Sequence, residues 1–101
     1  MKYIYLIRSD VNGHYKIGIT SNIKRRMRQL QTAQSSSLTL IDSFESKFPN
    51  KVETTLHNLY SYCKLSGEWF DLSVKEIAEF NKLCGKIENN YSFLKHSKDN
   101  I

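Results

Sequence analysis

Glu53 and His57 place a carboxylate and an imidazole four residues apart, in a stretch whose apolar residues recur at helical spacing. Residues three and four apart lie on one side of a helix, so we expect Glu53, His57 and Tyr60 to share a flank. A carboxylate is a natural ligand for Mg²⁺, whereas a neutral imidazole suits a transition metal or proton transfer. The same spacing is common on helices without a chemical role, so the pair alone indicates little.

The densest basic cluster of the chain lies within residues 24–28. Three apolar residues in this region recur at helical spacing and predict a short amphipathic helix: Ile23, Met27 and Leu30. On that helix Arg26 lies at the edge of the buried stripe, where it can reach a neighbouring sheet, and Arg25 points outward. We expect Lys24, Arg25 and Arg28 to contact nucleic-acid phosphates. A merely solvated helix surface is an equal alternative for Arg25 and Arg28.

Two tyrosines, Tyr3 and Tyr5, share one face of a predicted first strand. Asn12-Gly13 is typical of a two-residue hairpin turn, and the return strand carries Lys16 and Gly18 on one face and apolar residues on the other. A tyrosine in a strand is by default a packing residue. These residues therefore gain a chemical meaning only from what surrounds them.

Hydrophobic periodicity and turn residues predict the elements that must position these side chains. Strands are expected over residues 2–8, 14–19 and 38–46, and helices over 23–30, from 49 onward and from 74 onward. The second helix carries an apolar stripe: Val52, Leu56, Leu59 and Cys63. Gly67 to Phe70 predicts a turn and a short extended piece, and Ser73 with Glu76 has the spacing of a capping box. The pattern predicts an α+β domain with a small antiparallel sheet.

The length and composition of the chain favour one folded domain with an anionic partner. The chain has 101 residues, of which 40% are hydrophobic, so we expect a single domain over residues 1–90 and a polar, flexible tail over 91–101. Fifteen basic residues against ten acidic ones give a net charge of +5. Such a charge favours nucleic acid, since binding to phosphates releases counterions.

Cysteine usage and hydropathy predict where the protein acts. Cys63 and Cys84 have no His or Cys neighbours at metal-ligand spacing, so we expect both to be core residues of a reduced, cytoplasmic protein. No apolar run approaches the length of a membrane span, and we expect no membrane partner. The sequence carries no recognition helix or zinc finger, so target specificity is expected to come from a second subunit or a specificity partner.

The order of the chemical residues resembles the GIY-YIG nuclease superfamily. The resemblance rests on Tyr3-Ile4-Tyr5, Lys16-Ile17-Gly18, Arg26 eight residues past that glycine, and Glu53 in the next helix. Tyr15 to Thr20, Glu53 with His57, and Gly67 to Phe70 are more narrowly similar to a branch found in phages and large viruses. The resemblance covers residues 2 to 72 and implies a three-stranded antiparallel sheet flanked by helices.

The resemblance also implies a reaction, the hydrolysis of a DNA phosphodiester by in-line attack of water. Tyr5 would deprotonate or orient the water, Arg26 would stabilise the charged transition state, and Glu53 would hold one Mg²⁺ or Mn²⁺. Lys16 stands where the family usually has a tyrosine, and it would stabilise phosphate charge rather than act as a base. His57 is a candidate to share the catalytic work, and Tyr3 to contact the nucleic acid.

Two functions compete on this sequence. One is a metal-dependent endonuclease on DNA, with RNA as an open alternative substrate. The other is a nucleic-acid-binding module of the same fold that has lost catalysis, as the replacement of the second tyrosine by Lys16 would allow. Retention of both Arg26 and Glu53 favours the enzyme, because binding alone has little use for an arginine opposite a lone helix carboxylate.

Overall fold

A five-stranded antiparallel sheet forms the centre of the computed structural model, which describes residues 1–99. The strands lie in the order β3, β1, β2, β5, β4, with these bounds: β1 Lys2–Ser9, β2 Tyr15–Thr20, β3 Leu38–Ser46, β4 Lys64–Ser66 and β5 Trp69–Phe70. The α+β class is confirmed. The three expected strands are present, and the short hairpin around Gly67, expected only as a turn and an extended piece, adds two more at the β2 edge.

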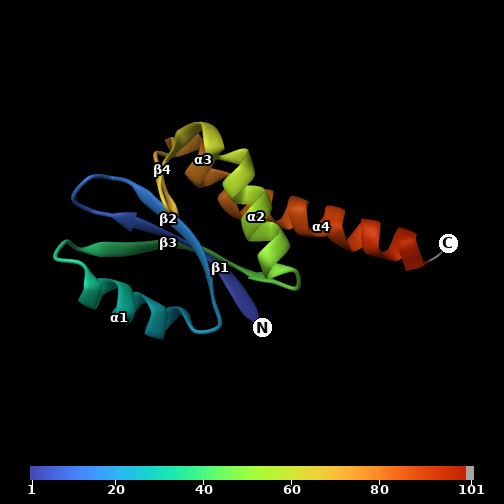
Figure 1. Ribbon diagram of the computed structural model, residues 1–101, viewed down its shortest axis with the longest axis horizontal. Helices are drawn as coiled ribbons and strands as arrows, with labels where there is room; N and C mark the ends of the chain where they lie inside the picture. Colours follow the sequence, from blue (N-terminus) through green and yellow to red (C-terminus); the bar gives the residue numbers. More distant parts are fainter. Residues whose placement is uncertain (100–101) are drawn as a thin grey trace.

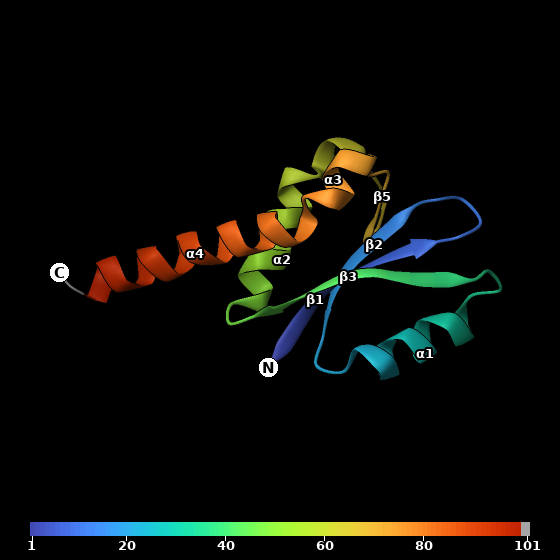
Figure 2. The ribbon, with the colours of Figure 1, turned by 180° about the vertical axis from the view of Figure 1, so that it is seen from behind.

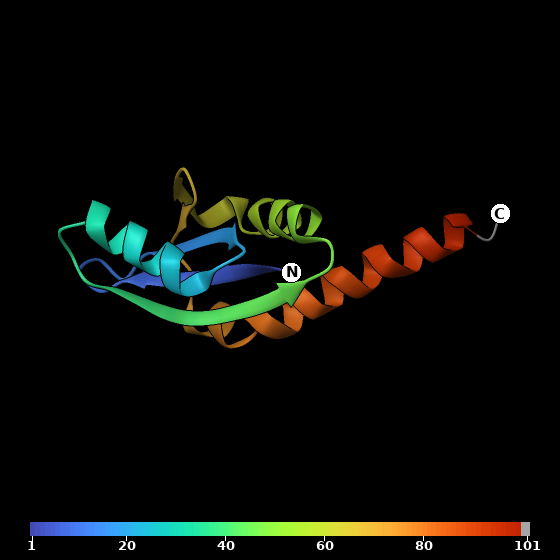
Figure 3. The same ribbon diagram turned by 90° about the horizontal axis from the view of Figure 1, so that it is seen from below.

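Four α-helices surround the sheet: α1 Ile23–Ala33, α2 Pro49–Leu59, α3 Val74–Ala78 and α4 Phe80–Asp99. A 3-10 turn, Ser61–Cys63, follows α2. Figure 1 shows α1 and α2 at opposite ends of the sheet and α4 extending away from it. Figure 2, the view from behind, shows α4 passing in front of α2. Figure 3 shows that α1 and α4 lie on opposite faces of the sheet. On the face opposite α4, the sheet is therefore covered by α1, and α2 lies beside β2.

The first hairpin sets the register on which the candidate site depends. The two-residue turn predicted at Asn12-Gly13 is wrong, because residues 10–14 form a longer loop in which Gly13 takes a φ of 71°. The loop is closed by the amide of Ser9, which donates to the carbonyl of His14 at 2.8 Å. Strand pairing then sets Tyr5 opposite Gly18 and Ile7 opposite Lys16. Directly opposed residues share a sheet face, so this register sets Tyr5 and Lys16 on the same face.

Strand alternation divides the core into two clusters, one on each face of the sheet. On the first face Ile4, Leu6 and Ile17 pack with residues of α2 and α4. On the second face Tyr5, Ile7 and Leu38 pack against Met27 and Leu30 of α1, with Trp69 at the border. The second cluster is small, and it brings α1 over the same face that carries Tyr5 and Lys16.

The buried stripe of α2 differs from the predicted one in its last turn. Val52 and Leu56 are fully buried, but Leu59 is 50% exposed and Tyr60 is buried in its place. The helix ends at Leu59, and the step of four from Leu56 continues the buried side at Tyr60, which turns into the core just past the helix end. Tyr60 therefore packs against Phe70 instead of sharing an accessible flank with Glu53 and His57.

The C-terminal helical region begins where the sequence predicts, but it does not end where predicted. Ser73 and Glu76 form the capping box, α3 breaks at Glu79, and α4 then buries Phe80, Cys84 and Ile87. The segment expected as a polar tail from residue 91 continues as helix to Asp99, and residues 100 and 101 of that segment lie outside the described part. Along residues 1–99, no helix is long and apolar enough to cross a bilayer.

The exchange of Leu59 for Tyr60 can be tested with a matched pair of variants. We expect Leu56→Ala to lower the free energy of unfolding by about 2–5 kcal/mol, because it leaves a cavity among fully buried side chains. Leu59→Ala, three residues away on the exposed side, should cost less than about 1 kcal/mol. Urea denaturation followed by circular dichroism measures both values, and equal losses would contradict the observed packing of α2.

Candidate active site

Tyr5 lies in the centre of the sheet with its ring against Gly18 of the neighbouring strand. The side chain is only 1% exposed. A methyl group built on Gly18 would collide with the hydroxyl oxygen and the adjoining ring carbon of Tyr5, and it would meet no other residue as closely. Gly18 has no positive φ, so the glycine is required by the close approach of the ring rather than by backbone strain. The pairing fixes where the phenol oxygen lies.

Lys16 is held in place by the hairpin that follows α2. It pairs across the strands with Trp69, and its Nζ lies 5.4 Å from the centroid of the indole ring. The same Nζ is 3.4 Å from Oε1 of Glu68, and the lysine side chain is only 13% exposed. An ammonium group between an indole face and a carboxylate has little freedom to move. Lys16 therefore supplies a fixed positive charge on the Tyr5 face.

The outer edge of β2 is where the remaining elements meet. The amide of Ile17 donates to the carbonyl of Glu68 at 3.2 Å, and the carbonyl of Ile17 lies 3.1 Å from Nε2 of His57. A carbonyl oxygen can only accept, so Nε2 carries the proton in this contact. The His57 ring also packs edge-on against Phe70, with 4.9 Å between centroids. One residue of β2 thus fixes both α2 and the β4–β5 turn.

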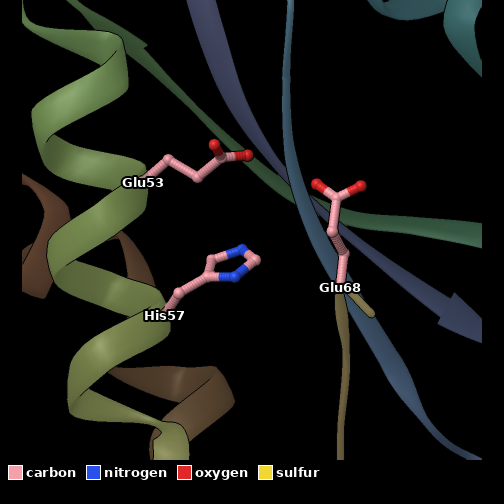
Figure 4. A group of neighbouring side chains, drawn as sticks. All are labelled: Glu53, His57 and Glu68. Atoms are coloured by element: carbon pink, nitrogen blue, oxygen red, sulfur yellow. The ribbon is translucent and has the colours of Figure 1, made fainter. Parts of the chain in front are cut away.

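Glu53, His57 and Glu68 form the most compact group of metal-ligating side chains in the described residues. Figure 4 shows Glu53 and His57 projecting from α2 toward Glu68, which comes from the β4–β5 turn. One ligand atom from each lies within 4.8 Å of those of the other two. Ligands that share an ion are separated by at most about 4 to 5 Å, because each sits roughly 2.0–2.6 Å from it. The donor set therefore fits one divalent cation.

Burial and charge shift the acid–base behaviour of Glu53 and Tyr5. Burial raises the pKa of the Glu53 carboxyl, and the negative charge of Glu68 raises it further, whereas the charges of His57 and Lys16 lower it. Burial likewise raises the pKa of the Tyr5 phenol, which the nearby Arg26 guanidinium partly offsets. Two carboxylates share this space with one lysine, so added positive charge would relieve their repulsion.

Arg26 is the residue of α1 that reaches this site. Its guanidinium lies near enough to the Tyr5 phenol to lower the pKa of that group. Among the described residues, Nε of Arg26 is the one buried side-chain polar atom with no hydrogen-bond partner. A buried donor without an acceptor costs free energy unless a ligand supplies the acceptor. The predicted position of Arg26 at the edge of the apolar stripe is confirmed.

The other basic residues of α1 lie elsewhere. Lys24 and Arg28 border a surface hollow with Leu40 of β3, the edge strand at the opposite end of the sheet from β4, and Arg25 is exposed. Tyr3, predicted to contact nucleic acid, is half-buried opposite Thr20 on the Tyr5 face. The structure thus brings together Tyr5, Lys16, Arg26, Glu53 and His57, and leaves Lys24 and Arg28 outside the site.

Glu68 is the site residue that sequence reasoning missed. The sequence predicts Gly67 to Phe70 as a turn and a short extended piece and gives Glu68 no role of its own. The available signal was an acidic residue directly after a turn glycine, here with a φ of 54°, in the short connection between β4 and β5. Only the pairing of β5 with β2 brings this carboxylate to Glu53.

A comparison with protein families gives this arrangement a context. The model of the T5orf172 domain matches residues 2–85, which include every site residue described above. The chain belongs to the T5orf172 domain family. This nuclease-associated domain supports a nuclease-like role with nucleic acid as partner, and the finer GIY-YIG assignment stays a prediction. No curated protein and no solved structure matches the chain.

The fit of Tyr5 over Gly18 generates a prediction for the T5orf172 domain. Gly18→Ala should lower the free energy of unfolding by about 1–3 kcal/mol, since Tyr5 must move to admit the methyl group. Gly85→Ala is the matched control, because its added methyl would meet only Phe44 at 3.9 Å within a helix. That change should raise stability by about 0.5–1 kcal/mol. Losses of equal size in the two variants would argue against the Tyr5–Gly18 contact.

The paired carboxylates of the T5orf172 domain generate a second prediction. Glu68→Gln should lower the pKa of Glu53 toward its usual range, because it removes the neighbouring charge while burial remains. A raised folded-state pKa means that stability is lost as pH rises from the unfolded-state pKa through the folded one, so the variant should lose less over that window. Carboxyl-carbon NMR titration of metal-free protein measures the shift. Glu79→Gln is the control, and an unchanged Glu53 pKa in Glu68→Gln would refute the coupling.

Proposed function

We propose that this domain is a GIY-YIG-type endonuclease that hydrolyses phosphodiester bonds in DNA with Mg²⁺ or Mn²⁺. The observation that supports it best is the meeting of Tyr5, Arg26 and Glu53 from three separate elements, with Lys16 and Glu68 between them. A phenol, a guanidinium, an ammonium and two carboxylates in one place match the needs of phosphoryl chemistry.

Arg26 and Lys16 would bind the scissile phosphate. Nε of Arg26 is buried and lacks a partner, so a phosphate oxygen would complete its hydrogen bonding and gain a charge-assisted contact. Lys16 is already fixed by Glu68 and Trp69, so it adds charge without a further loss of side-chain freedom. As negative charge grows on the phosphorus oxygens, both cations stabilise it.

Glu53 and Glu68 would hold the metal ion, and His57 stands beside them as a third donor. When bound, Mg²⁺ or Mn²⁺ supplies positive charge to the leaving oxygen and to the phosphate. Because Nε2 of His57 donates to the Ile17 carbonyl, the lone pair of the neutral ring is on Nδ1, which is free for a ligand or a proton. An imidazole donor would favour Mn²⁺ over Mg²⁺.

Tyr5 would orient the attacking water. The pKa of its phenol is raised by burial, so the group stays protonated near neutral pH and acts through hydrogen bonding rather than as a standing base. Arg26 beside the phenol would favour transient negative charge on its oxygen during attack. The water would approach in line with the leaving oxygen, and one water is consumed for each phosphodiester broken.

A catalytically inactive binding module is the competing function. The basic surface of α1 would serve both roles, since Lys24, Arg25 and Arg28 would contact phosphates without reading base sequence. Two carboxylates beside the phosphate site favour the nuclease over the binding module, because acidic groups without a metal ion repel DNA and would weaken a site that only binds. Sequence or structure specificity would come from a partner or a second subunit, and RNA remains a substrate to test beside DNA.

Plasmid cleavage tests the proposal. Supercoiled DNA should be nicked or linearised with Mg²⁺ or Mn²⁺, and Glu53→Ala and Arg26→Ala should each reduce the rate by about 10²–10³-fold or more. Lys86→Ala is the control, because it removes one positive charge from an exposed position on α4, outside the site and outside the basic surface of α1. Circular dichroism should show that all three variants fold. Cleavage at the parental rate by either variant would refute the site assignment, and metal-independent binding without cleavage would favour the binding module.

A further inference from the structure

A pocket of about 410 Å³ opens on the Tyr5 face, at the far end of the strands from Gly18. Along β1 the row Tyr5, Ile7, Ser9 runs from the site into this pocket. Gly18 and Lys16 run the same way along β2, and His14, just before that strand, lines the pocket. His14 is two residues from Lys16, a distance of about 7 Å along an extended chain. A ligand held by Lys16 can therefore extend directly into the pocket.

Trp69 joins the pocket to the site. Its indole ring forms part of the pocket wall, and the Nζ of Lys16 lies 5.4 Å from the centroid of the same ring. Trp69 is half-buried, and it packs against the small core cluster of Tyr5 and Ile7. The site and the pocket thus share one rigid aromatic surface.

The chemistry of the lining describes the group that fits there. Apolar surface comes from Val11, Leu65 and Trp69, of which Val11 is 76% and Leu65 is 48% exposed. Polar groups come from Ser9, Asn12, His14, Gln34, Ser36 and Ser66. Among the residues that the structure describes, no charged side chain lines this pocket. Such a lining accepts an uncharged, planar, hydrogen-bonding group, while the charged part of the ligand stays at Lys16.

Polar side chains without a partner within the chain support the same assignment. Over residues 1–99, the side chains of His14, Gln34 and Ser36 form no hydrogen bond with another residue, although each is half-buried. An imidazole, an amide and a hydroxyl offer both donors and acceptors, which is what the edge of a nucleobase requires. The indole supplies a surface on which any base can stack.

We propose that this pocket binds the base of a single unpaired nucleotide next to the scissile phosphate. This inference rests on the proposed function, and it narrows the substrate to nucleic acid with an unpaired or extruded base. A base inside a duplex cannot reach a side pocket, whereas an unpaired base enters it without the cost of breaking a pair. Trp69 stacks on the base, and His14, Gln34 and Ser36 bind its edge.

A binding experiment on the full chain in EDTA, where no metal supports cleavage, tests the pocket alone. The probes are one fluorescein-labelled DNA duplex in three forms: fully paired, with one unpaired nucleotide, and with an abasic residue in place of that nucleotide. We expect the unpaired nucleotide to bind roughly 5- to 150-fold more tightly than the other two, the range of base stacking on an aromatic side chain. Trp69 is the only tryptophan, so unlabelled DNA with the unpaired base should also quench the intrinsic fluorescence.

His14→Ala and Gln34→Ala should reduce the preference for the unpaired nucleotide, whereas Asn90→Ala, an exposed amide on α4, should not. Equal affinity for the three duplexes, or a preference that survives both pocket variants, would overturn the inference. Its failure can be told from failure of the nuclease proposal. Plasmid cleavage without a preference for the unpaired nucleotide would refute the pocket proposal alone. A preference for the unpaired nucleotide without plasmid cleavage would refute the nuclease proposal and keep the pocket.

Discussion

The two backbone groups of Ile17 hold the candidate site together. In the interior of the sheet, such groups would pair with another long strand, but β5 is only two residues long and leaves this stretch of β2 open. The Ile17 amide binds the carbonyl of Glu68, and its carbonyl binds the His57 imidazole. A buried backbone group without a hydrogen-bond partner costs free energy, so the open edge of β2 favours both contacts. They bring α2 and the β4–β5 turn, which are separate elements of the chain, within reach of one ion.

The second constraint is the absence of a side chain at Gly18. The Tyr5 ring occupies the space that a methyl group would need, which fixes the phenol within a sheet rather than on a mobile loop. Arg26 approaches from α1, which is attached to the same face through Met27 and Leu30. A reacting group held by packing on both sides can be positioned closely, as catalysis requires.

The charges of the site are balanced only in part. Lys16 pairs with Glu68, while Glu53 has no ion pair in the described residues and its pKa is raised. Arg26 keeps a buried donor without an acceptor. A bound cation would offset the excess negative charge of the two carboxylates, and a bound phosphate would accept a hydrogen bond from Arg26.

The sequence by itself indicated the three long strands, the helices that carry Arg26 and Glu53, and the edge position of Arg26, because strand and helix periods are local properties. It also marked Glu53 and His57 as one flank of α2. That Tyr5 and Lys16 share a face depended on the register of the first hairpin. Only the tertiary structure decided that Glu68 joins them, that Leu59 is exposed while Tyr60 is buried, and that Lys24 and Arg28 lie away from the site. Each of these depends on the pairing of β5 with β2 or on how a helix is rotated and where it ends. Such features are set by contacts between residues distant in sequence, which no local pattern encodes.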